Sequence, residues 1–196
     1  MNGRTFPLIL AAVVSLGAVA LGFRWGKDLA EQALFAARWT ARVGFPIFIL
    51  TYSASSLVRL WPNPTTKAVL RHRRQWGLGF ALAHTVHLGA LLAYLAISGT
   101  SRPLPILLGG GGAYVLLYAM ALTSNDAAMR ALGVWWKRLH TIGIHWLWAV
   151  FTFSYFGRLF DPARMATGLI LFPICLAALG LRLWAWAKVR RKLAAA

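Results

Sequence analysis

Acidic residues are scarce in this chain: Asp28, Glu31, Asp126 and Asp161 are the only four among 196 residues. Charged residues of both signs make up 13%, against about 25% in ordinary soluble domains, while hydrophobic residues make up 59%. This composition excludes an ordinary water-soluble fold and indicates a membrane protein. The 21 Lys and Arg give a net charge of +17. They lie at the ends of apolar runs, which favours a bilayer over nucleic acid as the partner.

Cysteine is nearly absent, because Cys175 is the single one and it lies inside an apolar run. One cysteine excludes an internal disulfide, a zinc ribbon, a cysteine-ligated iron–sulfur cluster and the CxxCH attachment of a c-type heme. Carboxylates are also missing from the apolar runs. A metal inside the membrane would therefore need imidazole ligands.

Long apolar segments are what the sequence does contain. Each needs roughly 20 residues to cross the hydrocarbon layer, and six qualify: residues 6–23, 43–60, 76–98, 105–123, 134–157 and 165–186. Pro and Gly mark several of the joins. The sequence predicts an all-α, polytopic membrane protein, a bundle of six transmembrane helices that forms a single domain over residues 1–196.

Three shorter features accompany the spans. The first span also fits a signal peptide, with a possible cleavage site at residues 18–20, and that alternative stays open. Residues 27–39 mix charge with Leu and Trp and predict an amphipathic helix on the outer membrane surface. Residues 124–126 read Ser-Asn-Asp, which predicts the cap of a short helix before the fifth span.

Lys and Arg set the orientation. With the N-terminus in the cytoplasm, the inner side has 13: Arg4, Arg59, Lys67, Arg71, Arg73, Arg74, Arg130, Lys137, Arg138, Lys188, Arg190, Arg191 and Lys192. The outer side has seven: Arg24, Lys27, Arg38, Arg42, Arg102, Arg158 and Arg164. The positive-inside rule then predicts that both termini are cytoplasmic.

Four of the five histidines lie inside predicted spans, His84 and His87 on the third and His140 and His145 on the fifth. Ionisable groups at membrane depth are costly, so they are candidates for function. His87 lies about 16 Å into its span and His140 about 9 Å into its own, at 1.5 Å per residue. Both helices start from the predicted inner side, so we expect His87 and His140 to ligate one iron as axial ligands.

A b-type heme suits two facing imidazoles in an apolar bundle. Its propionates need cations, and Arg73, Arg74, Lys137 and Arg138 lie at the inner ends of the same two helices. A structural hydrogen-bonding role stays open for the histidines, and for His84 and His145 we favour it over ligation. His72 lies in a basic loop and is expected to face solvent or lipid headgroups.

Two signatures in the sequence resemble those of a known family. Residues 73–78 read Arg-Arg-Gln-Trp-Gly-Leu ahead of His87, and a later stretch contains Thr-Ser at 123–124, Leu-Gly at 132–133 and Trp-Lys-Arg-Leu-His at 136–140. Together they resemble the ferric-reductase-like transmembrane domain family, most closely the heme-binding membrane subunit of the methionine-sulfoxide reductase system, the MsrQ type. The resemblance implies a cytochrome b-like electron carrier, expected in a bacterial inner membrane, with His87 and His140 at the heme-ligand positions.

One departure from the family pattern concerns a second heme. Members of the reductase branch often carry another His further along the fifth helix, but position 153, 13 residues after His140, is Phe. We therefore expect one heme per chain, with Phe153 and Trp148 packed in the outer half of the bundle. His145 lies only five residues after His140 and does not replace the missing ligand.

The leading hypothesis is an electron-transfer membrane subunit, with quinol or a flavin reductase as donor and an outer-side acceptor. We find no flavin or nicotinamide site of its own, so a redox partner protein would supply the electrons, and no catalytic residue is assigned. The alternative is a scaffold or accessory subunit that keeps the fold and uses its histidines structurally. Proton or metal transport is less favoured, because the spans carry no acids.

Overall fold

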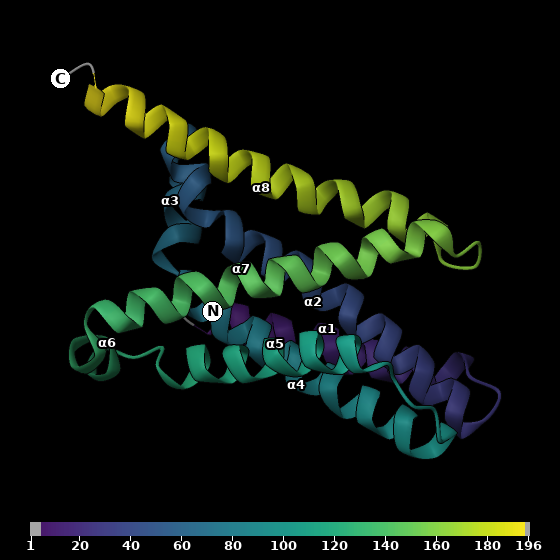
Figure 1. Ribbon diagram of the computed structural model, residues 1–196. Helices are drawn as coiled ribbons and strands as arrows, with labels where there is room; N and C mark the ends of the chain where they lie inside the picture. Colours follow the sequence, from purple (N-terminus) through teal and green to yellow (C-terminus); the bar gives the residue numbers. More distant parts are fainter. Residues whose placement is uncertain (1–4, 195–196) are drawn as a thin grey trace. The chain divides into compact units, whose positions relative to one another are not determined.

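The computed structural model describes residues 5–194, except for the side chain of Lys192. Arg4, which we counted in the orientation argument, lies outside the described residues. Of the described residues, 89% are helical and none is in a strand, which confirms the all-α class. Figure 1 labels the α-helices, which are α1 (Phe6–Trp25), α2 (Leu29–Leu60), α3 (Pro64–Arg71), α4 (Arg73–Ser98), α5 (Leu104–Leu122), α6 (Asp126–Leu132), α7 (Val134–Gly157) and α8 (Met165–Ala194). A 3₁₀ helix, η1 (Arg158–Phe160), lies between α7 and α8.

Five of these helices are long and apolar enough to cross a membrane: α1, α2, α4, α5 and residues Met165–Arg191 of α8. This supports an integral membrane protein. The helix predicted as the fifth span, α7, is not among them, because polar residues along it, including His140 and His145, lower its hydropathy. The six-span count is thus not confirmed, although α7 has the predicted bounds.

Our prediction for residues 27–39 is wrong. They do not form a separate surface helix, because α2 runs without interruption for 32 residues. Ala33, Ala36, Ala37 and Thr40 are buried on this part of α2. Because these residues are small, this face of α2 shows little hydrophobic contrast in the sequence. Small side chains nevertheless allow it to pack closely against another helix.

The chain divides into two units, which we describe separately. The first comprises residues 1–51 and 71–104. In it, α1 presents a buried row of small residues, Ala11, Ser15, Ala18 and Gly22, one turn apart. A Cβ at Gly22 would lie 2.9 Å from Cβ of Ala36, and one at Gly79 of α4 would lie 2.8 Å from the Pro7 carbonyl. Small residues thus allow α1, α2 and α4 to approach at backbone distance.

The second unit comprises residues 52–70 and 105–196. The sequence after α2 was expected to be a loop, but it forms α3, where the Asn63 side chain accepts a hydrogen bond from the Thr66 backbone N–H at 2.9 Å. The predicted short helix after Ser124 is confirmed as α6, and Asn125 caps it by accepting from Ala128 N–H at 2.8 Å. Figure 1 shows α7 and α8 side by side and antiparallel, joined through η1.

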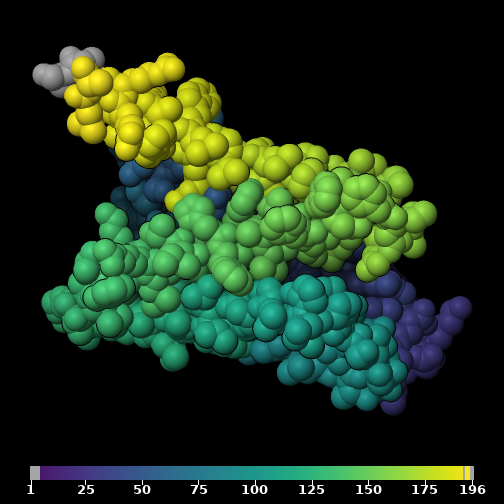
Figure 2. Space-filling model, in the orientation of Figure 1, coloured from purple at the N-terminus to yellow at the C-terminus, as the bar shows by residue number. Residues whose placement is uncertain are grey.

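Side chains of α5, α7 and α8 meet in this unit, and Figure 2 shows their surfaces one beside the next. Gly112 and Gly143 leave room for Trp146 and Met120 across the α5–α7 contact. The Trp148 indole donates to the Cys175 carbonyl of α8 at 2.9 Å, which agrees with the expected packing of Trp148. Phe153, in contrast, is 74% exposed. Our prediction that it packs in the outer half of the bundle is wrong, because its side chain is exposed on α7.

Candidate functional site

His87 and His140 lie on helices of different units, α4 in the first and α7 in the second. The structure describes the surroundings of each ring within its own unit. Among the described residues no group of three or more His, Cys, Asp or Glu could hold a metal ion. The described residues therefore form no metal site with three or more protein ligands. A heme has a different requirement, because it needs only one or two axial imidazoles from the chain.

Thr40 of α2 contacts the imidazole of His87. Its Oγ1 lies 3.1 Å from Nδ1 of His87. The same hydroxyl donates its single proton within α2, to the Ala36 carbonyl at 2.7 Å, shared with the Ala37 carbonyl at 3.1 Å. The oxygen is thus left to accept a hydrogen bond from Nδ1–H of His87. This assigns the neutral tautomer of His87 that carries its lone pair on Nε2.

Gly44 lies one turn beyond Thr40 on α2 and faces His84. A Cβ at Gly44 would lie 2.6 Å from Cε1 of His84, so only glycine permits the approach of the two helices. His84 is 7% exposed, and its ring lies 4.2 Å from Phe80 and 5.5 Å from His87, centroid to centroid. His84 is enclosed, whereas His87 is half-buried. This difference favours His87 as the ligand and a packing role for His84.

His140 contacts a threonine through Nε2, whereas His87 uses Nδ1. Its Nε2 lies 3.3 Å from Oγ1 of Thr123, and that hydroxyl donates to the Ala119 carbonyl at 2.7 Å. By the same reasoning, Nε2 of His140 carries the proton and Nδ1 the lone pair. Trp136 stacks on the ring at 4.1 Å between centroids, and its indole donates to the Thr123 carbonyl at 2.8 Å. The sequence indicated neither threonine as a partner of a histidine.

The candidate propionate partners lie in the first turns of the two helices. Arg73 Nε donates to the Thr51 carbonyl at 3.2 Å, which ties the start of α4 to α2. The Arg138 guanidinium lies 4.7 Å from the ring centroid of Trp135, while Arg74 and Lys137 are exposed. Arg73 and Arg74 share α4 with His87, and Lys137 and Arg138 share α7 with His140. His72 lies at the join between α3 and α4, outside the long helices.

His145 belongs to a different cluster in the second unit. Its Nδ1 lies 2.7 Å from the Thr141 carbonyl, one turn back on α7, and its ring meets Tyr52 edge-on at 5.7 Å. Arg182 of α8 donates to the Tyr52 carbonyl at 2.9 Å and stacks on the Tyr52 ring at 4.5 Å. Arg182 is the one Lys or Arg of the predicted span 165–186, and the sequence did not indicate this contact.

Imidazole nitrogens on two apolar helices are suitable heme ligands, but His87 and His140 are not equally well oriented for this role. A heme-ligating histidine binds iron through one ring nitrogen and donates the N–H of the other. His87 already has this arrangement, because Nδ1–H is engaged by Thr40 and Nε2 carries the lone pair. In His140 the roles are reversed: Nε2–H is engaged by Thr123, and the lone pair is on Nδ1, which lies next to Cβ and is sterically hindered. Its ring would have to leave Thr123 to offer the unhindered Nε2. Taken one ring at a time, each within its own unit, the two imidazoles therefore suit a heme ligand, with a side-chain rotation at His140.

Comparisons with known proteins identify the family. No family model and no solved structure matches the chain. The protein-methionine-sulfoxide reductase heme-binding subunit MsrQ of Cronobacter sakazakii is 31% identical over 147 residues, 64% of this chain and 72% of that protein. The MsrQ of Pectobacterium carotovorum is 30% identical over 161 residues, 75% of this chain and 80% of that protein. The chain belongs to the MsrQ family.

A third MsrQ, from an Enterobacter species, matches over 195 residues at 29% identity, 87% of this chain and 88% of that protein. The resemblance expected from the two sequence signatures is thereby confirmed. Membership of the MsrQ family and the candidate membrane spans agree on a bacterial-type integral membrane protein.

Proposed function

We propose that the chain is a six-span inner-membrane electron-transfer subunit, which binds one b-type heme through His87 and His140. The matched MsrQ proteins are named as heme-binding subunits of a methionine-sulfoxide reductase. Electrons would enter from quinol or from a flavin reductase and leave to a methionine-sulfoxide reductase on the outer side. When bound, the heme supplies the one-electron redox couple.

The contact between Thr40 and His87 is the observation that carries this proposal. A histidine that only links two helices has no need of a particular lone-pair position. Here the hydroxyl proton is committed to the Ala36 carbonyl, so the imidazole is oriented with Nε2 as the electron-pair donor. A hydrogen bond from the non-ligating nitrogen is the usual support of a metal-binding histidine.

The sixth span in this proposal is α7. Its 24 residues extend about 36 Å at 1.5 Å per residue, which is enough to cross the hydrocarbon layer. Lys137 and Arg138 lie in its first two turns, where long basic side chains reach the headgroup region. Together with Arg73 and Arg74 they would hold the propionates by charge-assisted hydrogen bonds. With these basic first turns on the inner side of the membrane, both termini would be cytoplasmic.

A second function, an accessory subunit with structural histidines, is favoured by one contact. Nε2 of His140, the ring nitrogen that is sterically free to bind iron, donates its proton to Thr123, and the lone pair is on the hindered Nδ1. In this alternative both histidines serve only to join helices through threonines. The purified protein would then be colourless although folded.

Visible spectra of the full chain and its variants test the proposal. We expect a Soret band that sharpens on reduction, and its loss in His87→Ala and in His140→Ala, because a bis-imidazole site needs both ligands. His72→Ala is the matched control and should keep the spectrum, since His72 lies outside the long helices. His84→Ala and His145→Ala should also keep the heme. Equal heme content in the His87 and His140 variants and in the unaltered protein would refute the ligand assignment.

A further inference from the structure

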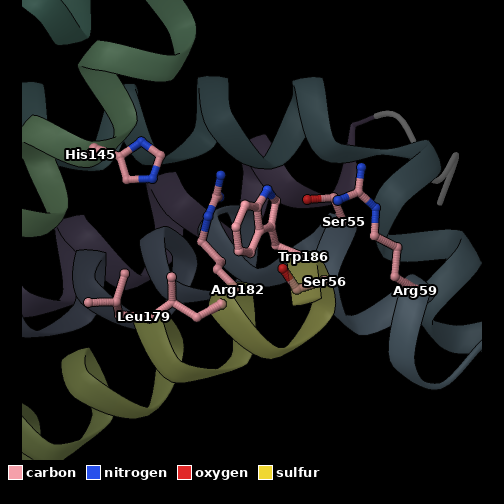
Figure 3. Close-up of a pocket in the computed structure, with 8 residues that line it drawn as sticks. Ser55, Ser56, Arg59, His145, Leu179, Arg182 and Trp186 are labelled. Atoms are coloured by element: carbon pink, nitrogen blue, oxygen red, sulfur yellow. The ribbon is translucent and has the colours of Figure 1, made fainter. Parts of the chain in front are cut away.

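A cavity of about 290 Å³ lies within the second unit, between the end of α2, α7 and α8 (Figure 3). Its polar wall contains two guanidinium groups, Arg59 from α2 and Arg182 from α8, and the hydroxyls of Ser55 and Ser56. No carboxylate lines it. The cavity is distinct from the rings of His87 and His140, which do not line it.

The positive charge of Arg59 and Arg182 favours the binding of an anion in this cavity. Arg182 lies inside a candidate span and six residues before Lys188, about 9 Å along the helix. A cation at such depth is costly unless it is paired. The Tyr52 carbonyl and ring hold one edge and one face of the Arg182 guanidinium, and neither neutralises its charge. Its remaining N–H groups form a fork suited to an oxyanion, phosphate above all.

The other residues of α8 that line the cavity are apolar. Leu179 and Leu183 of α8 line it together with Trp186, and Leu183 and Trp186 are 57% and 52% exposed. A free inorganic anion gains nothing from such a wall, whereas a lipid acyl chain packs against it. In Figure 3 the Trp186 ring lies between the Arg182 and Arg59 side chains. Trp61 and Trp184 meet edge-on at 5.5 Å near the same helix ends, where tryptophans mark the membrane interface.

Size excludes larger ligands. Ligand pockets range over about 300–1,000 Å³, so this cavity is at the small end and suits a headgroup rather than a whole porphyrin or flavin. We propose that it binds an anionic phospholipid, with Arg182 and Arg59 as the cationic partners of the phosphate group and an acyl chain along Leu179 and Leu183. This site is independent of the proposed heme function, because no heme-ligand candidate contributes to it.

Retention of a defined lipid by the purified full chain tests the proposal. The protein is reconstituted into phosphatidylcholine nanodiscs containing phosphatidylglycerol as the probe, and native mass spectrometry measures the lipid that stays bound after release. We expect one phosphatidylglycerol per chain, and about tenfold weaker retention in Arg59→Gln and in Arg182→Gln, because each removes charge-assisted hydrogen bonds to phosphate. Arg59→Gln keeps the test valid if Arg182→Gln unfolds, since Arg59 is exposed.

The matched control is Arg191→Gln, which removes the same charge from α8 at an exposed position outside the cavity. Its retention should equal that of the unaltered chain. Equal losses in Arg191→Gln and Arg59→Gln would show a general attraction of basic residues and would overturn the site. Displacement of the lipid by an equal concentration of inorganic phosphate would show a free-anion site and would overturn the lipid assignment.

Discussion

Replacing Thr40 with Val removes the hydroxyl that orients His87 and changes little else. Thr40 is fully buried, and valine has nearly the same shape, so no cavity is created. The carbonyl of Ala36 keeps its ordinary helical partner, the backbone N–H of residue 40, within α2. The cost to folding is the unmet Nδ1–H of His87, about 1–3 kcal/mol. The fold should therefore survive.

The effect on heme binding should be similar in free energy to the effect on folding. Loss of a hydrogen bond to a metal-ligating histidine typically weakens binding by about 10–100-fold, or about 1.4–2.7 kcal/mol. The rate of heme transfer from the purified protein to apomyoglobin measures this directly. The midpoint potential should rise as well, because an imidazole without its Nδ1–H acceptor donates less electron density to iron.

Thr40→Ser is the control, because serine keeps a hydroxyl at the same position. We expect it to restore both the transfer rate and the potential to near the values of the unaltered chain. A Thr40→Val protein with an unchanged transfer rate and an unchanged potential would refute the role of Thr40 and weaken the assignment of His87.

Three further predictions concern the second histidine, the heme count and the orientation. Thr123→Val should retain heme at least as well as the unaltered chain, because His140 no longer has to leave that hydroxyl; weaker retention would show that Thr123 supports the ligand instead. A pyridine hemochrome assay should give one heme per chain, since the exposed Phe153 offers no ligand for another, and a ratio near two would contradict this. A cysteine introduced at Asn63 should react with a membrane-impermeant thiol reagent only after the membrane is opened, with buried Cys175 silent. Labelling from outside would show an inverted topology.

Several helix bounds follow from local chemistry and were predictable. Pro105 lies at the start of α5, Asn125 caps α6, and Gly133 separates α6 from α7 with a positive φ of 51° that favours glycine. The cap of α3 was equally readable, because Asn63 precedes Pro64, but the basic residues around it suggested only a loop. These signals act over one turn, so a single sequence carries them in full.

Packing faces were harder to predict. Residues 27–39 resembled a surface helix because charge alternates with Leu and Trp, yet the side that decides the packing consists of alanines and Thr40. Small residues have little hydrophobic contrast, so periodicity does not show which way they face. Phe153 was misplaced for a related reason, since a large apolar residue suits lipid as well as a protein interior.

The amino-acid sequence by itself determined the membrane class, the helical architecture, the candidate ligands His87 and His140, and the family. Each depends on composition, spacing or a short motif. Only the tertiary structure decided which residue each of these side chains contacts: Thr40 contacts His87, Thr123 contacts His140, and Tyr52 contacts Arg182. Thr40 and His87 are 47 residues apart in the chain, and Tyr52 and Arg182 are 130 apart. Such pairs arise from the close approach of helices, which no local pattern encodes.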